Sequence, residues 1–294
     1  MRVFITGMRS FVGLEVIKQC QAKGIECVGV DVIDSKEDNC HKADIRHAGI
    51  ADFIPEGVDA IIHLAAMSRD PDCKNKAYEC FDTNVMGTLN LINAAQKRDA
   101  KQFIFASTEW VYDSFQKDEI KDENSLIDMS KLTSEYAFSK LVSEGNLRQK
   151  FLHGFCPVTI LRFGIIYGPR GNNWSAVESL FHAVKTKDEV QVGSLKTGRY
   201  FIHIEDIVSG IIQSIGLQGF NIINLEGEKF VTLGDIINTS MQILGKTPKV
   251  VESAPAEYNV RHVANAKAKK MLNWKPDVSL GKGLRSLLPE AKVL

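Results

Sequence analysis

Short apolar runs alternate with longer segments of helical spacing along the first half of the chain. The apolar runs are short enough for buried strands and lie at residues 3–6, 27–31, 59–66 and 102–107. Segments with apolar positions three and four apart lie at residues 14–23, 78–97 and 134–151. Strands that alternate with helices predict a parallel, doubly wound α/β sheet. Such sheets bind ligands at the edge where the carboxyl ends of the strands meet.

The turn after the first strand, which begins at Gly7 and ends at Gly13, has the composition of a phosphate-binding turn. Free backbone N–H groups at the start of the following helix suit a pyrophosphate. Asp31 ends the next strand, where a carboxylate can accept hydrogen bonds from the hydroxyls of an adenosine ribose. The pattern predicts a bound dinucleotide, and Asp31 favours NAD over NADP. Arg9 could reach a 2′-phosphate, which keeps NADP as the alternative, and Ser10 must avoid the pyrophosphate or bond to it.

Two further segments suit a dinucleotide. Asp44 and Ile45 lie in a loop where a side chain and a backbone amide could meet adenine. The run at residues 59–66 ends in small residues, which lets a cofactor approach closely. His63 lies inside that run and is expected to be a core residue rather than a ligand.

The chemistry is expected from Tyr136 and Lys140, which lie four residues apart in a helical pattern and therefore share a face. An ammonium ~6 Å from a phenol at an effective dielectric of ~20 favours the phenolate by roughly 3 kcal/mol, or about two pKa units. That shift would let the phenol accept a proton at working pH. Thr108 follows the strand at residues 102–107 and could hold the same substrate oxygen. Alone, a Tyr-x-x-x-Lys pair is more often an ordinary contact on a helix surface. Together with the dinucleotide pattern, it indicates an enzyme that removes a proton from an alcohol while a hydride leaves.

Composition excludes several classes of function. The chain has 36 Lys and Arg against 36 Asp and Glu, so it carries no electrostatic footprint for nucleic acid. No apolar run approaches the ~20 residues of a membrane helix. Six cysteines without a Cys-x-x-Cys pair indicate idle thiols in a reducing compartment, and seven unclustered histidines argue against a metal site. With Met1 leading directly into a strand, a soluble cytoplasmic protein is expected.

These motifs together resemble those of the extended short-chain dehydrogenase/reductases. Within that group the chain resembles the NAD-dependent sugar-nucleotide epimerase/dehydratase family. The resemblance continues downstream in three segments, at residues 161–169, 199–206 and 267–276. It implies a Rossmann-type doubly wound parallel sheet with a smaller C-terminal α/β substrate-binding lobe.

The resemblance also implies roles for matching residues. Tyr136 would be the general base, Lys140 would bond the nicotinamide ribose and lower the pKa of Tyr136, and Thr108 would orient the sugar hydroxyl. The residues implied to bind cofactor are Gly7, Arg9, Ser10, Phe11, Val12, Gly13, Asp31, Asp44, Ile45, Leu64, Ala65, Ala66, Asn84, Ala106, Ser107, Tyr136, Lys140 and Phe163. The residues implied to bind the nucleotide-diphospho-sugar are Thr108, Trp110, Val192, Arg199 and Arg261. For Arg261 an ordinary surface position is an equal alternative.

The expected domains are a NAD-binding unit at residues 1–163, to which the chain returns around 199–225, and a substrate-binding lobe at 164–294. A homodimer is expected as well, because members of the family pack two helices from each subunit into a four-helix bundle. In this chain those helices are residues 78–97 and 134–151.

Departures from the family pattern leave the substrate and reaction open. Ile165 replaces an Asn near the substrate phosphates, Asp113 replaces a Gly, and Ala264-Asn265 stand where an Asp is frequent. Sugar-nucleotide dehydratases tend to carry an acid–base pair after the catalytic Thr, whereas this chain has Glu109 followed by Trp110.

The sequence therefore favours a NAD-dependent epimerase that works through a transient 4-keto sugar, with Glu109 as an additional catalytic candidate. The alternatives are a 4,6-dehydratase, an NADP-dependent 4-keto-sugar reductase, and a catalytically retired cofactor-binding regulatory module.

Overall fold

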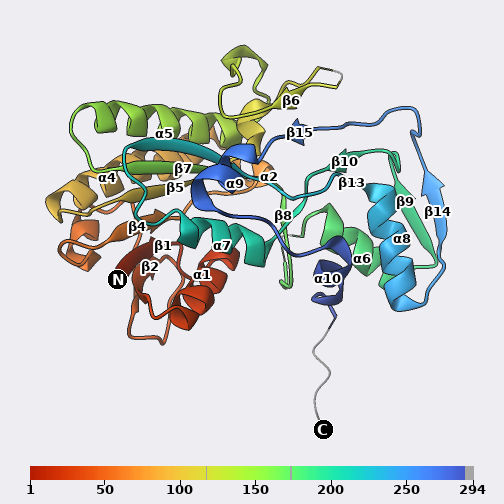
Figure 1. Cartoon of the computed structure of the whole chain (residues 1–294), viewed down its shortest axis with the longest axis horizontal. Coiled ribbons are helices and arrows are strands. Elements are labelled where there is room, and N and C mark those ends of the chain that lie inside the picture. Colours follow the sequence, from red (N-terminus) through yellow and green to blue (C-terminus); the bar gives the residue numbers. More distant parts are fainter. Residues whose placement is uncertain (117, 173, 289–294) are drawn as a thin grey trace, which may run out of the picture.

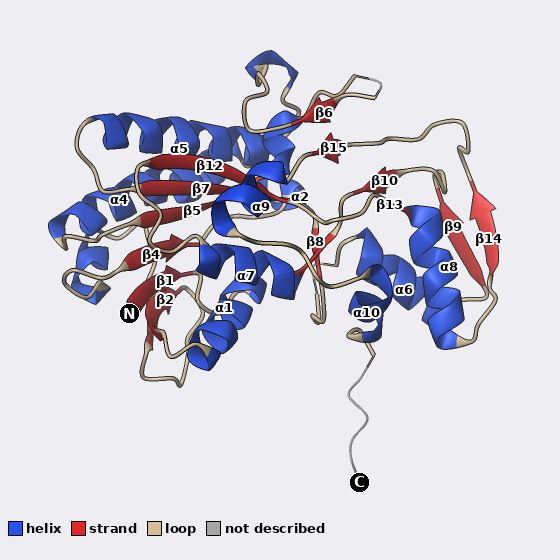
Figure 2. Ribbon diagram, in the orientation of Figure 1, coloured by secondary structure: helices blue, strands red, loops and turns tan. Residues whose placement is uncertain are grey.

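Seven parallel strands form one sheet at the centre of the larger unit (Figure 2). The computed structural model describes residues 1–116, 118–172 and 174–288. In spatial order the strands are β12 (Phe220–Leu225), β7 (Val158–Phe163), β5 (Phe103–Thr108), β4 (Ala60–His63), β1 (Arg2–Thr6), β2 (Glu26–Asp31) and β3 (Cys40–Lys42). Each neighbouring pair runs parallel. The expected doubly wound parallel sheet is confirmed.

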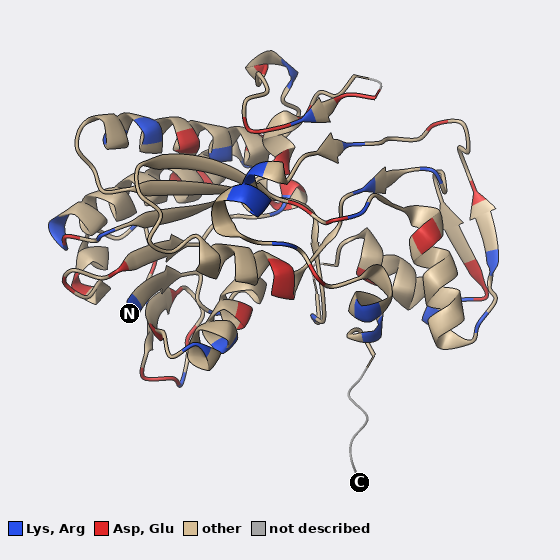
Figure 3. Ribbon diagram, viewed as in Figure 1, with Lys and Arg blue, Asp and Glu red and all other residues tan. Residues whose placement is uncertain are grey.

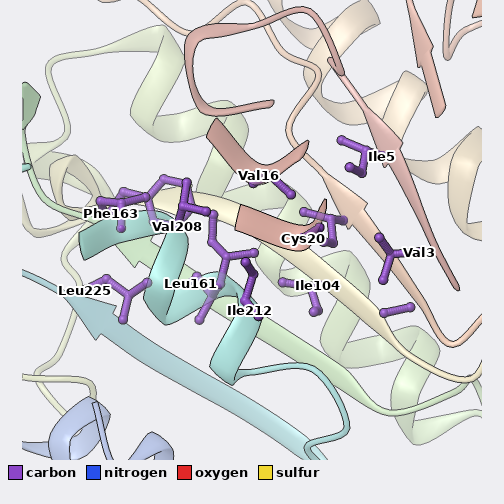
Figure 4. Packing of buried hydrophobic residues seen from close by; sticks show 14 of the residues in the cluster. Val3, Ile5, Val16, Cys20, Ile104, Leu161, Phe163, Val208, Ile212 and Leu225 are labelled. Carbon is purple, nitrogen blue, oxygen red and sulfur yellow. The ribbon is translucent and has the colours of Figure 1, made fainter. Parts of the chain in front are cut away.

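Helices cover both faces of this sheet (Figure 1). On one face lie α1 (Phe11–Ala22) and α7 (Ile204–Gln213), and on the other α4 (Gly87–Lys97) and α5 (Glu135–Leu152). Successive strand residues point to opposite faces, so Val3 and Ile5 join the first core and Phe4 the second. Figure 4 shows the first core, where α1 and α7 pack over the sheet. Each fully buried apolar side chain contributes about 1.5–3 kcal/mol.

Two expected helices differ in detail from the pattern. The helix expected at residues 14–23 begins at Phe11, because the Ser10 hydroxyl accepts the N–H of Gly13 and caps it earlier. The helix expected at residues 78–97 consists of α3 (Ala77–Phe81), a π-helical turn (Asp82–Met86) and α4. A π turn of this kind often marks a functional site.

The smaller lobe is built around its own apolar core (Figure 1). Its helices are α6 (Ala176–Thr186), α8 (Leu233–Leu244) and α10 (Leu280–Arg285). A two-stranded parallel sheet, β9 (Glu189–Val192) with β14 (Lys249–Glu252), closes one side. Capping boxes at Ser175 and Thr232 begin α6 and α8.

The chain passes between the two units several times. The short strand pairs are β8 (Ile166–Tyr167) with β11 (Ile202–His203), β10 (Gly198–Arg199) with β13 (Val231–Thr232), and β6 (Ile120–Lys121) with β15 (His262–Val263). The described part of the segment 113–128 thus contains a strand. Short helices occur at α2 (Asp70–Cys73) and α9 (Ala266–Leu272), and 3-10 turns at Ala48–Phe53, Glu109–Tyr112 and Met129–Lys131.

Residues 204–225 belong to the larger unit, where α7 packs against α1 and β12 extends the sheet. A later stretch returns as well, because the buried Trp274 indole donates to the Asp206 carbonyl at 3.0 Å. Positive and negative side chains are interspersed over both units (Figure 3). In the described part of the chain, no helix combines the length and apolar character needed to cross a membrane.

Candidate functional site

A cavity of about 370 Å³ lies at the carboxyl ends of β1, β2 and β4. Eight of the residues expected to bind cofactor line it: Gly7, Ser10, Asp31, Asp44, Ile45, Leu64, Ala65 and Ala66. The strand–turn–helix unit therefore places the expected residues around one cavity, with a carboxylate at its rim.

Close backbone packing explains the two glycines of the turn. Gly7 has a φ of +71°, and a Cβ there would lie 2.8 Å from the Ala65 nitrogen. A Cβ on Gly13 would lie 2.4 Å from the Gly7 carbonyl oxygen. The Ser10 hydroxyl accepts the Gly13 N–H at 3.1 Å, so this side chain is held by the helix it caps.

Asp31 and Arg9 differ in how they face the cavity. The Asp31 carboxylate accepts the backbone N–H groups of Arg9 at 2.8 Å and Ile33 at 3.0 Å, and each oxygen can accept one more bond. The Arg9 guanidinium instead forms an ion pair with Glu37 at 3.3 Å. The carboxylate is thus available to a ribose, whereas Arg9 is engaged elsewhere.

The other residues expected near the cofactor make contacts within the protein. Phe11 and Val12 form the first turn of α1, and the Arg170 guanidinium lies 4.6 Å from the centre of the Phe11 ring. Asn84, in the π turn, bonds the Met67 backbone and the Ser139 hydroxyl. Ser107 donates to Glu144, and Phe163 belongs to the core shown in Figure 4.

Thr108, Tyr136 and Lys140 meet beside β5. Thr108 is the last residue of β5, and its hydroxyl lies near enough to the Tyr136 phenol to lower the pKa of that group. Lys140 lies one turn further along α5 and donates to the Ala106 carbonyl at 2.8 Å, above the Phe105 ring at 4.6 Å. Strand end and helix start therefore bring a hydroxyl, a phenol and an amine to one edge of the sheet.

Burial governs the protonation of this trio. It raises the pKa of Tyr136, and the nearby Thr108 hydroxyl only partly offsets this. Burial also lowers the pKa of Lys140 to about 8. The Lys140 ammonium donates to the Ala106 carbonyl. In this structure burial is the main influence on the pKa of the phenol, and it acts in the opposite direction to the lowering estimated from the Tyr136–Lys140 spacing.

Glu109 directly follows Thr108 and is buried, and its Oε1 has no hydrogen-bond partner within the protein. The structure places a second carboxyl beside it, that of Glu226, which is fully buried with both oxygens unpartnered. Sequence reasoning missed Glu226. The available signal was a Glu immediately after the apolar run at residues 220–225, where a parallel strand would end.

The residues expected to contact substrate divide into two groups. Arg261 pairs with Asp113 at 3.0 Å and stacks 4.7 Å above the Trp110 ring, while its Nη1 has no partner within the protein. Arg199 donates to the Asn259 carbonyl at 2.8 Å, and burial lowers its pKa to about 10. Val192, by contrast, is packed in the apolar core of the smaller lobe.

A larger cavity of about 590 Å³ has Asp113, Phe115, Lys131, Tyr258 and Arg261 among its lining residues. Arg261 therefore lines this cavity, and its charge also acts to lower the pKa of Glu109. Within the described residues no group of three or more His, Cys, Asp or Glu could hold a metal ion.

His63 is a core residue, as expected. Its Nδ1 bonds the Thr6 hydroxyl at 2.7 Å and its Nε2 the Thr88 hydroxyl at 2.9 Å. Burial holds its pKa well below the usual value, so the ring stays neutral.

Comparison with known proteins gives a family and a set of distant relatives. The model of the NAD dependent epimerase/dehydratase family matches residues 3–224. A UDP-glucuronate 4-epimerase of Thermodesulfobacterium geofontis is 26% identical over 96% of this chain and 93% of its own. A UDP-N-acetyl-alpha-D-glucosaminuronate decarboxylase of Bacillus cytotoxicus is 27% identical over 98% of this chain and 96% of its own. The solved structure of the Thermus thermophilus UDP-glucose 4-epimerase with NAD matches with a TM-score of 0.82 at 21% identity, covering 98% and 97% of the two chains; this likeness shows the fold.

Proposed function

The chain belongs to the NAD dependent epimerase/dehydratase family, and from that premise we propose that it is a NAD-dependent epimerase of a nucleotide-diphospho-sugar. The observation that carries the proposal is the meeting of Thr108, Tyr136 and Lys140 at the sheet edge, beside the cavity lined by Gly7 and Asp31. Relatives named as a UDP-glucuronate 4-epimerase and a UDP-sugar decarboxylase support a UDP-sugar substrate. Oxidation at C4 of the sugar would be common to both chemistries.

NAD bound in this cavity would supply a hydride acceptor that takes one hydride from C4 and returns it. Tyr136 takes the proton of the C4 hydroxyl, which leaves a transient 4-keto sugar after the hydride departs. The Thr108 hydroxyl lies near the phenol and would hold the same substrate hydroxyl. Return of hydride and proton to the opposite face of the ketone completes the epimerisation.

Tyr136 needs a positive charge nearby, because burial alone keeps its proton on. Lys140, which donates to the Ala106 carbonyl in this structure, would turn its ammonium to the phenol and to the ribose of bound NAD, whose oxidised ring would supply a second positive charge. Lys140 has a pKa of about 8, so it is mainly charged at neutral pH. The Tyr136 phenolate would therefore form only when NAD is bound, and the phenol would keep its proton while the site is empty.

The cofactor is NAD rather than NADP. Asp31 keeps free acceptor capacity at the cavity rim, where it favours two ribose hydroxyls and repels a phosphate. Arg9, the one residue that favoured NADP, is paired with Glu37. A 2′-phosphate would have to break that pair and sit against a carboxylate.

The nucleotide-diphospho-sugar enters from the side of Arg199 and Arg261. Both guanidiniums are partly buried and lie near Glu109, and Arg261 has an unpartnered Nη1. A guanidinium fork suits a diphosphate or a sugar carboxylate. The cavity beyond Arg261 has the volume for a nucleotide.

Incubation with UDP-glucose, UDP-glucuronate and their N-acetylamino counterparts tests the proposed function. The expected product is the C4 epimer of one of these sugars, seen by NMR, with no change of mass. A product lighter by water would show a dehydratase, and one lighter by carbon dioxide a decarboxylase. Conversion only of added 4-keto sugars with NADPH would show a reductase, and no conversion at all a retired module.

The active form is a homodimer in which two helices of each subunit form a four-helix bundle. In one subunit α3 and α5 are in contact through the Phe81 and Phe138 rings at 5.5 Å, and Tyr78, Met86 and Phe138 are exposed beside them. Sedimentation equilibrium is expected to show a dimer that Met86→Glu weakens. Leu126→Glu, at an exposed position outside these helices, is the control. A monomer at micromolar concentration would contradict the proposal.

A further inference from the structure

Three neighbouring strands end in register at the edge of the sheet. Thr108 of β5 and Leu225 of β12 both pair with Phe163 of β7, which lies between them (Figure 2). The next residues of the three strands are Glu109, Gly164 and Glu226. A carboxyl therefore follows each outer strand, and a glycine follows the middle one.

Gly164 leaves the space in which the two carboxyls meet. Neighbouring strands lie ~4.8 Å apart, so the ends of β5 and β12 are separated by roughly 10 Å with β7 between. A Cβ on Gly164 would lie 2.2 Å from Oε2 and 2.8 Å from Cδ of Glu226. Any side chain at position 164 would thus displace the Glu226 carboxyl.

The two buried carboxyls interact with each other, and no protein donor reaches Oε1 of Glu109 or either oxygen of Glu226. Burial raises the pKa of both, and the charge of Glu109 raises that of Glu226 further. Arg261 and Arg199 favour the charged form of Glu109. Because two neighbouring buried carboxyls cannot both ionise, one of them holds a proton. That proton resides mainly on Glu226, and Glu109 is the carboxylate.

Unpartnered buried polar atoms of this kind need a ligand to satisfy them. Glu109 Oε1, both oxygens of Glu226 and Nη1 of Arg261 all lack a partner within the described protein. Glu109 directly follows Thr108, which would hold the sugar hydroxyl, and the register of β5, β7 and β12 brings the Glu226 position to the same edge of the sheet. C4 epimerisation itself uses Tyr136 and does not require a second proton-transfer group.

We propose that Glu109 and Glu226 form a second acid–base site, which exchanges hydrogen at a carbon next to the transient ketone of the bound sugar. The inference rests on the proposed function, because a hydrogen at C3 or C5 becomes acidic only while C4 is a ketone. Glu109 takes that proton, the C–H electron pair becomes the enolate of the ketone, and the protonated Glu226 is the acid of the pair. Return of a proton from the pair to the same carbon restores the ketone, so no oxidant or other reactant is needed.

Turnover in D₂O tests this inference with UDP-glucuronate and UDP-glucose as the probes. The expected result is deuterium at C3 or C5 of recovered sugar, located by NMR, together with C4 epimer. C4 epimer that contains no deuterium at either carbon would overturn the inference and leave the proposed function standing. Absence of C4 epimer with both probes would contradict the proposed function and remove this inference with it.

Variants then test whether the pair performs the exchange. In Glu226→Gln and Gly164→Ala the ratio of exchange to C4 epimerisation is expected to fall about 10²-fold or more, as for loss of a general acid–base group. Glu228→Gln, two residues along the chain, removes an exposed carboxylate paired with Lys269 and is the matched control with an unchanged ratio. An undiminished ratio in Glu226→Gln would assign the exchange to another group and overturn the inference.

Infrared spectroscopy of the protein without substrate tests whether the Glu109–Glu226 pair holds a proton. The native protein near neutral pH is expected to show the carbonyl stretch of a protonated carboxylic acid, which Glu226→Gln removes and Glu228→Gln keeps. Absence of this band from the native protein would mean that Glu109 and Glu226 are both ionised, and would contradict the claim that the pair holds a proton.

Discussion

Two rows of residues cross the strands β5, β7 and β12, two positions apart along each strand. The two rows differ in how far their polar groups are hydrogen bonded. In the inner row, Arg162 of β7 is flanked by Ser107 of β5 and Asn224 of β12. In the outer row, Gly164 is flanked by Glu109 and Glu226. The inner row is hydrogen bonded throughout, whereas the outer row has carboxylate oxygens without partners.

The partners of the inner row come from α5 and the turn after β5. Arg162 donates to the Glu144 carboxylate at 3.0 and 2.6 Å and to the Tyr112 hydroxyl at 2.6 Å. Ser107 donates to Glu144 at 2.5 Å, and Tyr112 donates to Asn224 at 3.1 Å. Every charge in this row is balanced, so it fixes the ends of the strands.

The difference shows which part of the edge is built for stability and which for a ligand. A buried ion pair with all its hydrogen bonds is rigid but expensive to break. A buried carboxyl without partners lowers stability, and the fold tolerates it where a ligand supplies the partners. Changes in the two regions should therefore separate loss of stability from loss of activity.

The largest effect is expected at Tyr136, on the catalytic side of the comparison. Tyr136→Phe removes the proton acceptor and keeps the ring, so turnover should fall ~10²–10⁴-fold. The urea midpoint and NAD affinity should stay close to those of the native protein. Retention of most of the activity would contradict the assignment of the base.

The inner row should respond in the reverse manner. Arg162→Met leaves the Glu144 carboxylate buried and unpaired, which should cost about 3–5 kcal/mol of unfolding free energy in urea. Arg2→Met breaks the exposed pair with Glu26 and is the matched control, expected to leave the unfolding free energy almost unchanged because solvent screens this pair. Equal losses of unfolding free energy in Arg162→Met and Arg2→Met would show that the inner row does not stabilise the fold more than an exposed ion pair does.

The outer row should make stability depend on pH. The pKa of Glu226 is raised well above the usual 4.5, so the folded protein holds a proton that the unfolded chain releases. Stability should therefore fall as pH rises above about 4.5, until pH passes the raised pKa. Glu226→Gln should lose this decline and gain about 1–2 kcal/mol near neutral pH. If the urea midpoint changed with pH in the same way in the native protein and in Glu226→Gln, the claim that Glu226 is a buried acid with a raised pKa would be contradicted.

The smallest effect is expected at Asp31, which lies away from both rows at the end of β2. Asp31→Ala should narrow the preference for NAD(H) over NADP(H) by about tenfold, or ~1.4 kcal/mol, in calorimetric titration. The urea midpoint and the ratio of exchange to C4 epimerisation should not change. Equal or tighter binding of NADP(H) by the native protein would contradict the choice of cofactor.

The parts that could be predicted from the sequence are those with short-range signatures. Periodicity identified β1, β2, β4 and β5 and the helices around α1, α4 and α5. The glycine-rich turn and the strand that ends at Asp31 marked Gly7, Ser10 and Asp31, which line the cavity. Tyr136 and Lys140 share a face because they are four apart on α5. Thr108 joins them because its strand ends at the edge that faces this helix.

The parts that could not be predicted depend on which strands become neighbours. Glu226 is 117 residues from Glu109 along the chain, and only the placement of β12 beside β7 brings them together. Val192, matched as a substrate contact, instead packs in a core that the pattern does not define. The pKa of Tyr136 depends on how deeply the phenol is buried and where Lys140 points, and spacing specifies neither.

The central claim, that C4 is oxidised and reduced on one side of the same bound cofactor, has one direct test. UDP-glucuronate and UDP-glucose carrying deuterium at C4 are each incubated with the protein and unlabelled NAD. The proposed mechanism requires the C4 epimer to keep the deuterium at C4, since the hydride that leaves is the one that returns. An epimer that has lost the label to solvent would show inversion by deprotonation and would contradict the roles given to Thr108, Tyr136 and Lys140.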